Sequence, residues 1–142
     1  MIVREIWYNI KVIINKLPMS DKKKILIVED DKFLGKMLSK MLEGSNYDIS
    51  IASSGKEALA KAVSENPSLI LLDIMLPDLD GFDILQSLKN NEATNKIPVV
   101  ILSNLGQPED VEQGRKLGVL DYIVKSDFSL DDVVKKVGKY LN

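Results

Sequence analysis

Three acidic residues directly follow two apolar runs of the chain. Glu29 and Asp30 follow the run 25–28, and Asp73 follows the run 69–72. Such runs are typical of strands that are buried on both faces of a parallel sheet. Because an open α/β sheet binds its ligands at the carboxyl ends of its strands, we expect the three carboxylates to meet at that edge.

A hydroxyl and an amine end two further apolar stretches. Ser103 closes the stretch that begins at Ile97, and Lys125 follows the stretch 120–124. Each of these polar residues, taken alone, is better explained as an ordinary strand end, a helix N-terminus or surface charge. Four polar strand ends with complementary chemistry are poorly explained by chance, so we interpret them together as one site.

The available residue types limit the chemistry of that site. The 142 residues include no His and no Cys, which excludes Ser-His triads, imidazole or thiolate metal sites and disulfides. Clustered carboxylates without a cation would raise at least one pKa, whereas oxygen ligands suit a hard cation, best Mg²⁺ with several waters. A Lys and a hydroxyl beside that ion would complete a pocket for a phosphoryl group, with Asp73 as the nucleophile.

The composition indicates one ordinary globular domain. The chain is 45% hydrophobic and carries a formal charge of −2, with a pI near 5.2. This length can bury a proper core, and the acidic balance argues against nucleic acid as a partner.

Strand and helix patterns alternate from residue 22 onward. Strands are expected at 24–29, 47–52, 69–72, 97–103 and 120–124, and helices at 33–42, 55–64, 82–88, 108–117 and from 130 nearly to 142. The helix-end signals are Gly44 at C′, a capping box of Ser54 and Glu57, a start at Asp80-Gly81, Pro108 at N1, a stop at Gly118 and Ser129 at N-cap. This alternation implies βαβ units, and right-handed crossovers favour a doubly wound parallel sheet with helices on both faces.

The first 18 residues form a segment of their own. Its apolar residues recur at the spacing of an amphipathic helix and are Val3, Ile6, Trp7, Ile10, Ile13, Ile14 and Leu17. The segment is too short and too charged to span a membrane, and it lacks the features of a signal peptide. Pro18 ends the pattern, and Met19 could itself be an initiator, which would make residues 1–18 an upstream extension of a domain at 22–142.

An exposed stripe of this kind would be a solubility liability, so we expect something to cover it. The candidates are the domain's own surface, a second copy of the chain and a membrane interface, and a poorly ordered leader is the remaining alternative. Arg4, Lys11 and Lys16 against Glu5 give residues 1–20 a net charge of +2, which would favour anionic lipid. Because Glu5 and two Asn share the polar face with these basic groups, we favour a homodimer through the helix over contact with a membrane surface.

Four segments carry a resemblance to a known family. They are Ile25-Leu26-Ile27-Val28-Glu29-Asp30-Asp31, Leu71-Leu72-Asp73-Ile74-Met75-Leu76-Pro77, Val100-Ile101-Leu102-Ser103 and Asp121-Tyr122-Ile123-Val124-Lys125. In order and spacing over residues 22–142, they resemble the receiver (REC) domain of two-component response regulators, of the stand-alone chemotaxis type. The resemblance implies a flavodoxin-like α/β fold with five parallel strands in the order 2-1-3-4-5.

The resemblance also implies how the site would act. Asp73 would accept the phosphoryl group, and Lys125 and Ser103 would hold its oxygens. Tyr122 would be the aromatic residue that turns inward when Ser103 is drawn to the phosphoryl group. The surface formed by the fourth helix, fifth strand and fifth helix of the domain would then change its affinity for a downstream protein.

For the metal, the resemblance implies Mg²⁺ bound by Asp30, Asp73 and the backbone carbonyl of Met75, with Glu29 in contact through water. The phosphoryl donor would be the phosphohistidine of a partner histidine kinase or phosphotransfer protein. The chain would then be a cytoplasmic phosphoacceptor that assists its own reactions, and not a dedicated enzyme.

We therefore predict a single-domain receiver that switches partner binding in phosphorelay signalling. One alternative is a receiver-like interaction module that works without phosphorylation, which the intact acids, Ser103 and Lys125 weigh against. The other is an aspartyl-phosphate hydrolase or phosphotransferase. Such enzymes commonly carry a second Asp two residues after the nucleophile, and this chain has Met75 there.

The chain departs from the family pattern near the site. Ser126 follows Lys125 where the family usually has Pro, and a non-proline cis bond costs about 2.5–4 kcal/mol, so we predict a trans bond. Asn104 stands where a small residue is usual. Met75 and Leu105 flank the approach of the hydrolytic water and cannot orient it, so we predict slow loss of the phosphoryl group.

Overall fold

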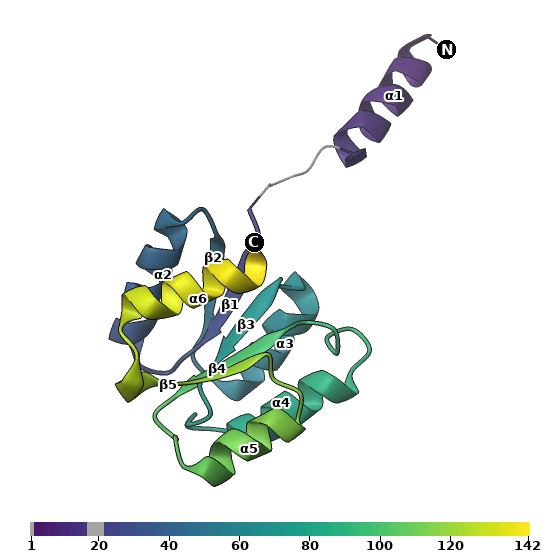
Figure 1. Cartoon of the computed structure of the whole chain (residues 1–142). Coiled ribbons are helices and arrows are strands. Elements are labelled where there is room, and N and C mark those ends of the chain that lie inside the picture. Colours follow the sequence, from purple (N-terminus) through teal and green to yellow (C-terminus); the bar gives the residue numbers. More distant parts are fainter. Residues whose placement is uncertain (1, 17–21) are drawn as a thin grey trace.

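The computed structural model describes residues 2–16 and 22–142. It contains an N-terminal helix, α1 (Ile2–Lys16), and an α/β domain (Figure 1). Leu17, Pro18 and Met19 lie outside the described residues, as does the side chain of Ile14, so the expectations that rest on them stay predictions.

Five parallel strands form one sheet in the order β2-β1-β3-β4-β5, which confirms the predicted order. The strands are β1 (Lys24–Val28), β2 (Asp48–Ala52), β3 (Leu69–Leu72), β4 (Val99–Ser103) and β5 (Asp121–Val124). The central strand β3 is buried along its whole length. It therefore delivers the next residue, Asp73, to the middle of the carboxyl edge of the sheet.

Helices cover both faces of this sheet (Figure 1). They are α2 (Lys32–Gly44), α3 (Gly55–Glu65), α4 (Gly81–Asn90), α5 (Pro108–Lys116) and α6 (Leu130–Leu141), with a short 3₁₀ turn, η1 (Lys125–Asp127), after β5. Side chains of α2 and α6 pack with Leu69 and Leu71 of β3. Those of α3 and α4 pack with Ile70 and Leu72, on the opposite face. The alternation follows from the two-residue period of a strand, and each fully buried side chain contributes about 1.5–3 kcal/mol.

Three of the helix starts expected from the sequence are confirmed. Asp80 caps α4, Pro108 is the first residue of α5, and Ser129 forms a capping box with Asp132 at the start of α6. These residues satisfy or replace backbone amides that have no partner inside the helix.

Two helix-end expectations were wrong in detail. Ser54 does accept the amide of Glu57, but the Glu57 carboxylate accepts from Ser53 instead of closing a box with Ser54. Gly44 belongs to the last turn of α2, and Asn46 takes the positive φ of 70° expected near that end. An Asn side chain tolerates the left-handed region well enough to replace glycine there.

The apolar stripe of α1 is exposed. Val3, Ile6, Trp7, Ile10 and Ile13 keep between 41% and 79% of their surface accessible. Figure 1 shows α1 apart from the sheet and its covering helices. No helix among the described residues is long and apolar enough to cross a membrane.

The two ends of the α/β domain meet at the edge opposite Asp73. The Lys23 ammonium donates a hydrogen bond to the carbonyl of Leu141, the last residue of α6. This contact joins the residue before β1 to the end of the last helix, and Figure 1 shows the C-terminus beside the start of β1.

Candidate functional site

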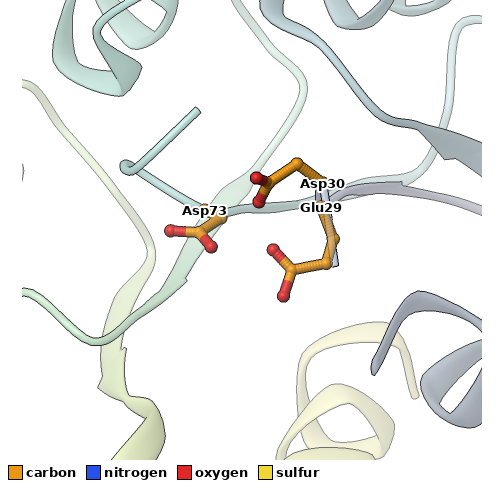
Figure 2. Close-up of side chains that lie close together, drawn as sticks. All are labelled: Glu29, Asp30 and Asp73. Carbon is orange, nitrogen blue, oxygen red and sulfur yellow. The ribbon is translucent and has the colours of Figure 1, made fainter. Parts of the chain in front are cut away.

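Three carboxylates meet at the carboxyl edge of the sheet, as the sequence predicts. One oxygen each from Glu29, Asp30 and Asp73 lies within 4.8 Å of the others, and Figure 2 shows the three side chains grouped beside the ends of β1 and β3. Glu29 and Asp73 are buried, with 4% and 6% of their surface exposed, whereas Asp30 is exposed. Two of the three acids are thus withdrawn from water and one faces it.

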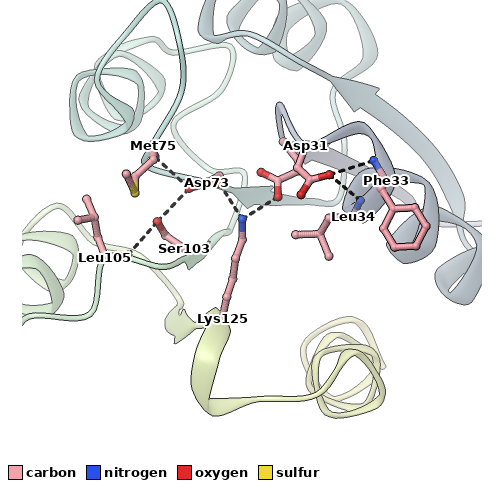
Figure 3. Close-up of polar contacts among 9 residues, drawn as sticks. Asp31, Phe33, Leu34, Asp73, Met75, Ser103, Leu105 and Lys125 are labelled. Atoms are coloured by element: carbon pink, nitrogen blue, oxygen red, sulfur yellow. Dashed lines mark hydrogen bonds and ion pairs between the residues drawn. The ribbon is translucent and has the colours of Figure 1, made fainter.

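Lys125 lies between the two buried acids. Its Nζ is 2.6 Å from Glu29 Oε1 and 2.8 Å from Asp73 Oδ2. The lysine follows β5, two strands away from β3, and its side chain reaches back along the edge to Asp73 (Figure 3). Buried ions need an opposite charge, so this ammonium stabilises both carboxylates.

The second oxygen of Asp73 is held by two neutral donors. Ser103 Oγ and the backbone amide of Met75 each donate to Asp73 Oδ1 over 2.9 Å. Ser103 is fully buried at the end of β4, the strand next to β3. Asp73 is therefore contacted from two other strand ends and from its own loop (Figure 3).

The ionisation of the buried acids differs. Burial, together with the neighbouring Asp73, raises the pKa of Glu29 from 4.5 to about 8 despite Lys125. Burial also acts to raise the pKa of Asp73, but Glu29, Lys125 and the Met75 amide outweigh it and hold this pKa below its ordinary value. Near neutral pH, Asp73 is thus the ionised partner and Glu29 holds a proton, in line with the expected effect of clustered acids.

The residues present suit a hard divalent cation. Glu29 Oε2 is buried and has no hydrogen-bond partner, which leaves an oxygen able to face an ion or its water. The cluster contains only oxygen ligands, the kind that Mg²⁺ prefers. A divalent charge would also favour the ionised form of Glu29.

The loop after β3 folds back beside the acids. Met75 pairs with Asp80, and the amide of Gly81 donates to the carbonyl of Ile74 over 3.0 Å. A Cβ at Gly81 would lie 2.4 Å from Ile74 Cα, so only glycine fits this crossing.

Two nearby acids have structural contacts of their own. Asp31 accepts the amides of Phe33 and Leu34 and caps α2, so it does not join the carboxylate cluster (Figure 3). Asp78, which sequence reasoning missed, accepts the amides of Gly55 and Lys56 and ties the loop after β3 to the start of α3. No local signal could identify its partner, which is more than 20 residues away.

Tyr122 lies on the α5 side of the sheet. Its hydroxyl donates to the carbonyl of Leu105, in the loop that follows Ser103. The ring is half-buried, and burial raises the pKa of Tyr122 to about 12. The tyrosine is thus directed toward the loop that follows Ser103.

The described residues contain no cis peptide bond, so the Lys125–Ser126 bond is trans, as predicted. This bond lies within η1, which leads into α6. An open groove of about 760 Å³ lies beside Asp30, and Met75 and Leu105 are among its other lining residues. The exposed acid of the cluster is therefore accessible from solvent through this groove.

Comparisons with known proteins agree with this geometry. The family described as "Response regulator receiver domain" matches residues 25–138. The chain is 40% identical over 114 residues to the "DNA-binding dual master transcriptional regulator RpaA" of Synechocystis sp., an alignment that covers 80% of this chain and 47% of that protein. It spans about half the length of the first curated relatives it matches.

Solved structures give the same result. A receiver domain of the Francisella response regulator 1452 has a TM-score of 0.77 and 34% identity, covering 84% of this chain and 96% of that one. The Vibrio cholerae chemotaxis protein CheY4 has a TM-score of 0.77 and 27% identity, covering 84% and 99%. The α/β part of the chain is therefore similar to complete receiver domains.

The raised pKa of Glu29 predicts how stability changes with pH in metal-free protein. The folded state binds the Glu29 proton more tightly than the unfolded chain, because its pKa rises from 4.5 to about 8. The resulting stabilisation is complete below pH 4.5 and is lost as the pH rises through about 8. We expect the free energy of unfolding, measured with urea in the presence of a chelator, to fall between about pH 5 and 8.

Glu29→Gln should flatten this decline because the amide cannot ionise. Glu92→Gln, at an exposed site after α4, is the matched control and should leave the slope unchanged. An equal decline in the Glu29→Gln variant would contradict the assignment.

Proposed function

The chain belongs to the response regulator receiver domain family, and we propose that Asp73 accepts a phosphoryl group from the phosphohistidine of a partner histidine kinase or phosphotransfer protein. The observation that supports this best is the environment of the Asp73 carboxylate. Lys125 and Ser103 contact its two different oxygens, and two further acids lie within ligand distance of it.

In this proposal Asp30, Asp73 and the backbone carbonyl of Met75 would hold Mg²⁺, and Glu29 would contact the ion through water. When bound, the ion would supply positive charge that stabilises the phosphoryl oxygens. Asp30 is the exposed member of the cluster and is the side from which a hydrated ion would enter.

The transfer itself needs little from the protein beyond positioning and charge. A carboxylate oxygen of Asp73 attacks phosphorus, the phosphorus–nitrogen bond of the donor breaks, and the released imidazole nitrogen takes up a proton from solvent. The Lys125 ammonium and the Ser103 hydroxyl, which now contact the carboxylate, would then hold two of the phosphoryl oxygens. The chain is thus a phosphoacceptor that assists its own modification.

Phosphorylation would be read out on the surface of α5, β5 and α6. Ser103 contacts Asp73, and Tyr122 contacts the loop after Ser103, so both residues link the acceptor to this surface. We propose that a downstream protein binds there with changed affinity. A cytoplasmic location and the absence of nucleic acid among the partners of this domain also belong to the proposal.

The first prediction concerns the acceptor. Asp73→Asn should abolish labelling by phosphoramidate in the presence of Mg²⁺, since an amide oxygen cannot form the acyl phosphate. Asp30→Ala should lower labelling and its dependence on Mg²⁺ together, because a direct ligand is lost. Intact-mass spectrometry after each incubation measures the modified fraction.

Asp83→Asn is the matched control, because Asp83 is an exposed acid on α4. It should be labelled like the unchanged protein. Strong labelling of the Asp73→Asn variant at another residue would refute the proposal, and an unlabelled native protein would favour the interaction module that works without phosphorylation.

The second prediction concerns the lifetime of the phosphoryl group. Met75 is more than half exposed at the groove, and Leu105 also lines it. Since neither side chain can orient a water for attack, we expect slow self-dephosphorylation. Replacing Met75 by Asn and Leu105 by Glu should speed the loss of phosphate, measured by phosphate release after rapid removal of the donor.

Met37→Asn is a suitable control, because Met37 is a partly exposed methionine on α2 that does not line the groove. Hydrolysis that is fast in the unchanged protein, and unaffected by the polar substitutions, would contradict this prediction.

The third prediction concerns α1, for which we propose self-association. Its exposed stripe includes Trp7, the single tryptophan of the chain. Full burial of each such side chain would contribute about 1.5–3 kcal/mol, and a short isolated helix is marginal in water. We expect a dimer by sedimentation, with blue-shifted and quencher-protected Trp7 emission.

Ile10→Lys should dissociate this dimer, whereas Asn9→Lys, which adds the same charge beside the stripe, should not. A chain that starts at Met19 should be monomeric. Solvent-like Trp7 emission, with monomers in every form, would show that the segment does not self-associate.

A further inference from the structure

A glycine in the interior of α5 is poorly explained by helix propensity. Gly114 is buried within this nine-residue helix, where glycine is less favourable than alanine. Two other glycines within helices have room for a side chain: a Cβ at Gly35 or Gly138 would meet nothing closer than 3.8 Å. Gly114 has no such room, so its neighbours must account for it.

The neighbour is the ring of Tyr122. A Cβ at position 114 would lie 2.9 Å from Tyr122 Cδ2 and 3.3 Å from Cε2, and 3.0 Å from Ile101 Cδ1. The terminal methyl of Ile101 can move aside by rotation. The tyrosine ring is rigid and attached to β5, so both of its carbons must move together and the whole ring must shift away from α5.

That position is one end of a continuous path to Asp73. The Tyr122 hydroxyl donates to the Leu105 carbonyl, and the Leu105 amide donates to Ser103 Oγ over 3.3 Å. Ser103 Oγ in turn donates to Asp73 Oδ1 over 2.9 Å. Helix α5 thus contacts, through Gly114, the last member of a hydrogen-bonded series that begins at the phosphoacceptor.

We propose that Gly114 is a positioning residue for the switch: its missing side chain lets the Tyr122 ring lie against α5 and bond to Leu105, and so couples α5 to the Ser103–Asp73 pair. This inference rests on the proposed function for its role in signalling, but the arrangement itself exists without phosphorylation. Substitution of Gly114 by alanine should leave Asp73 and its contacts in place and break the hydrogen bond between Tyr122 and Leu105.

The displaced Tyr122 ring can move toward solvent. Among the described residues, β5 is an edge strand that pairs with β4 alone, and Tyr122 is already half-exposed there. Rotation about its side-chain bonds would move the ring into solvent, which would break the bond to Leu105. The loop after Ser103 would then lose one of its fixed contacts.

The test uses the full chain labelled with 3-fluorotyrosine, in which the Tyr122 signal among four tyrosines is assigned from a Tyr122→Phe variant. Gly114→Ala should move this fluorine signal from a buried to a solvent-exposed environment. It should also speed amide hydrogen exchange at Leu105 by about tenfold. An unchanged Tyr122 signal and unchanged Leu105 exchange would overturn the proposal.

Gly138→Ala is the matched control, since it gives α6 the same gain in helix propensity with no close neighbour. It should raise the midpoint of thermal unfolding and leave the Tyr122 signal in place. If Gly114→Ala does not fold, the comparison moves to a Tyr122→Ala background. There the proposal requires that Gly114→Ala be tolerated, and unfolding of that double variant would overturn it.

A second measurement separates this inference from the proposed function. Beryllofluoride with Mg²⁺ should change the fluorine signal of Tyr122 in the native chain, and this response should be lost in Gly114→Ala, while phosphoramidate still labels Asp73. A native chain that is never labelled would refute the proposed function alone. A retained response in Gly114→Ala would refute the role of Gly114 alone.

Discussion

The cost of burying an ionised carboxylate governs the arrangement of the Asp73 edge. Asp73 is buried beside the buried acid Glu29, and a buried negative charge is stable only beside an opposite charge and hydrogen-bond donors. Lys125 provides that charge from the end of β5. Its contact with both acids therefore depends on the register of the pairs β1–β3, β3–β4 and β4–β5. Val28 pairs with Leu72, which puts Glu29 level with Asp73, and Ser103 pairs with Val124, which puts Lys125 one residue beyond Ser103. A slip of one residue would turn these side chains to the other face of the sheet.

The acidic residues at this edge have two different roles. Asp31, Asp78 and Asp80 accept backbone amides at the starts of α2, α3 and α4, where helix dipoles favour negative charge. Glu29, Asp30 and Asp73 are left for an ion and for chemistry. Backbone amides therefore stabilise the negative charge of the three capping acids. The carboxylates at this edge repel one another less strongly than their number suggests.

Much of the fold and the site could be predicted because both depend on local patterns. The buried strands β1, β3 and β4 and the edge strand β5 are largely apolar, and the polar residue at the end of each is fixed at the edge by the parallel arrangement. This is why Glu29, Asp73, Ser103 and Lys125 were identified from the sequence. What could not be predicted depends on contacts between distant segments. The partner of Asp78 is at the start of another helix, and the need for Gly114 arises from the Tyr122 ring on β5. Neither of these contacts has a signature within its own segment.

The contact between Lys23 and the Leu141 carbonyl has a practical consequence for engineering. It brings the start of β1 beside the end of α6, so a short peptide could join these ends and new termini could be opened in a surface loop, giving a circular permutant with the same core. Reporter proteins fused at either end would share one side of the domain, away from Asp73, Lys125 and the groove beside them. Such fusions would leave the reactive edge free for large donor proteins.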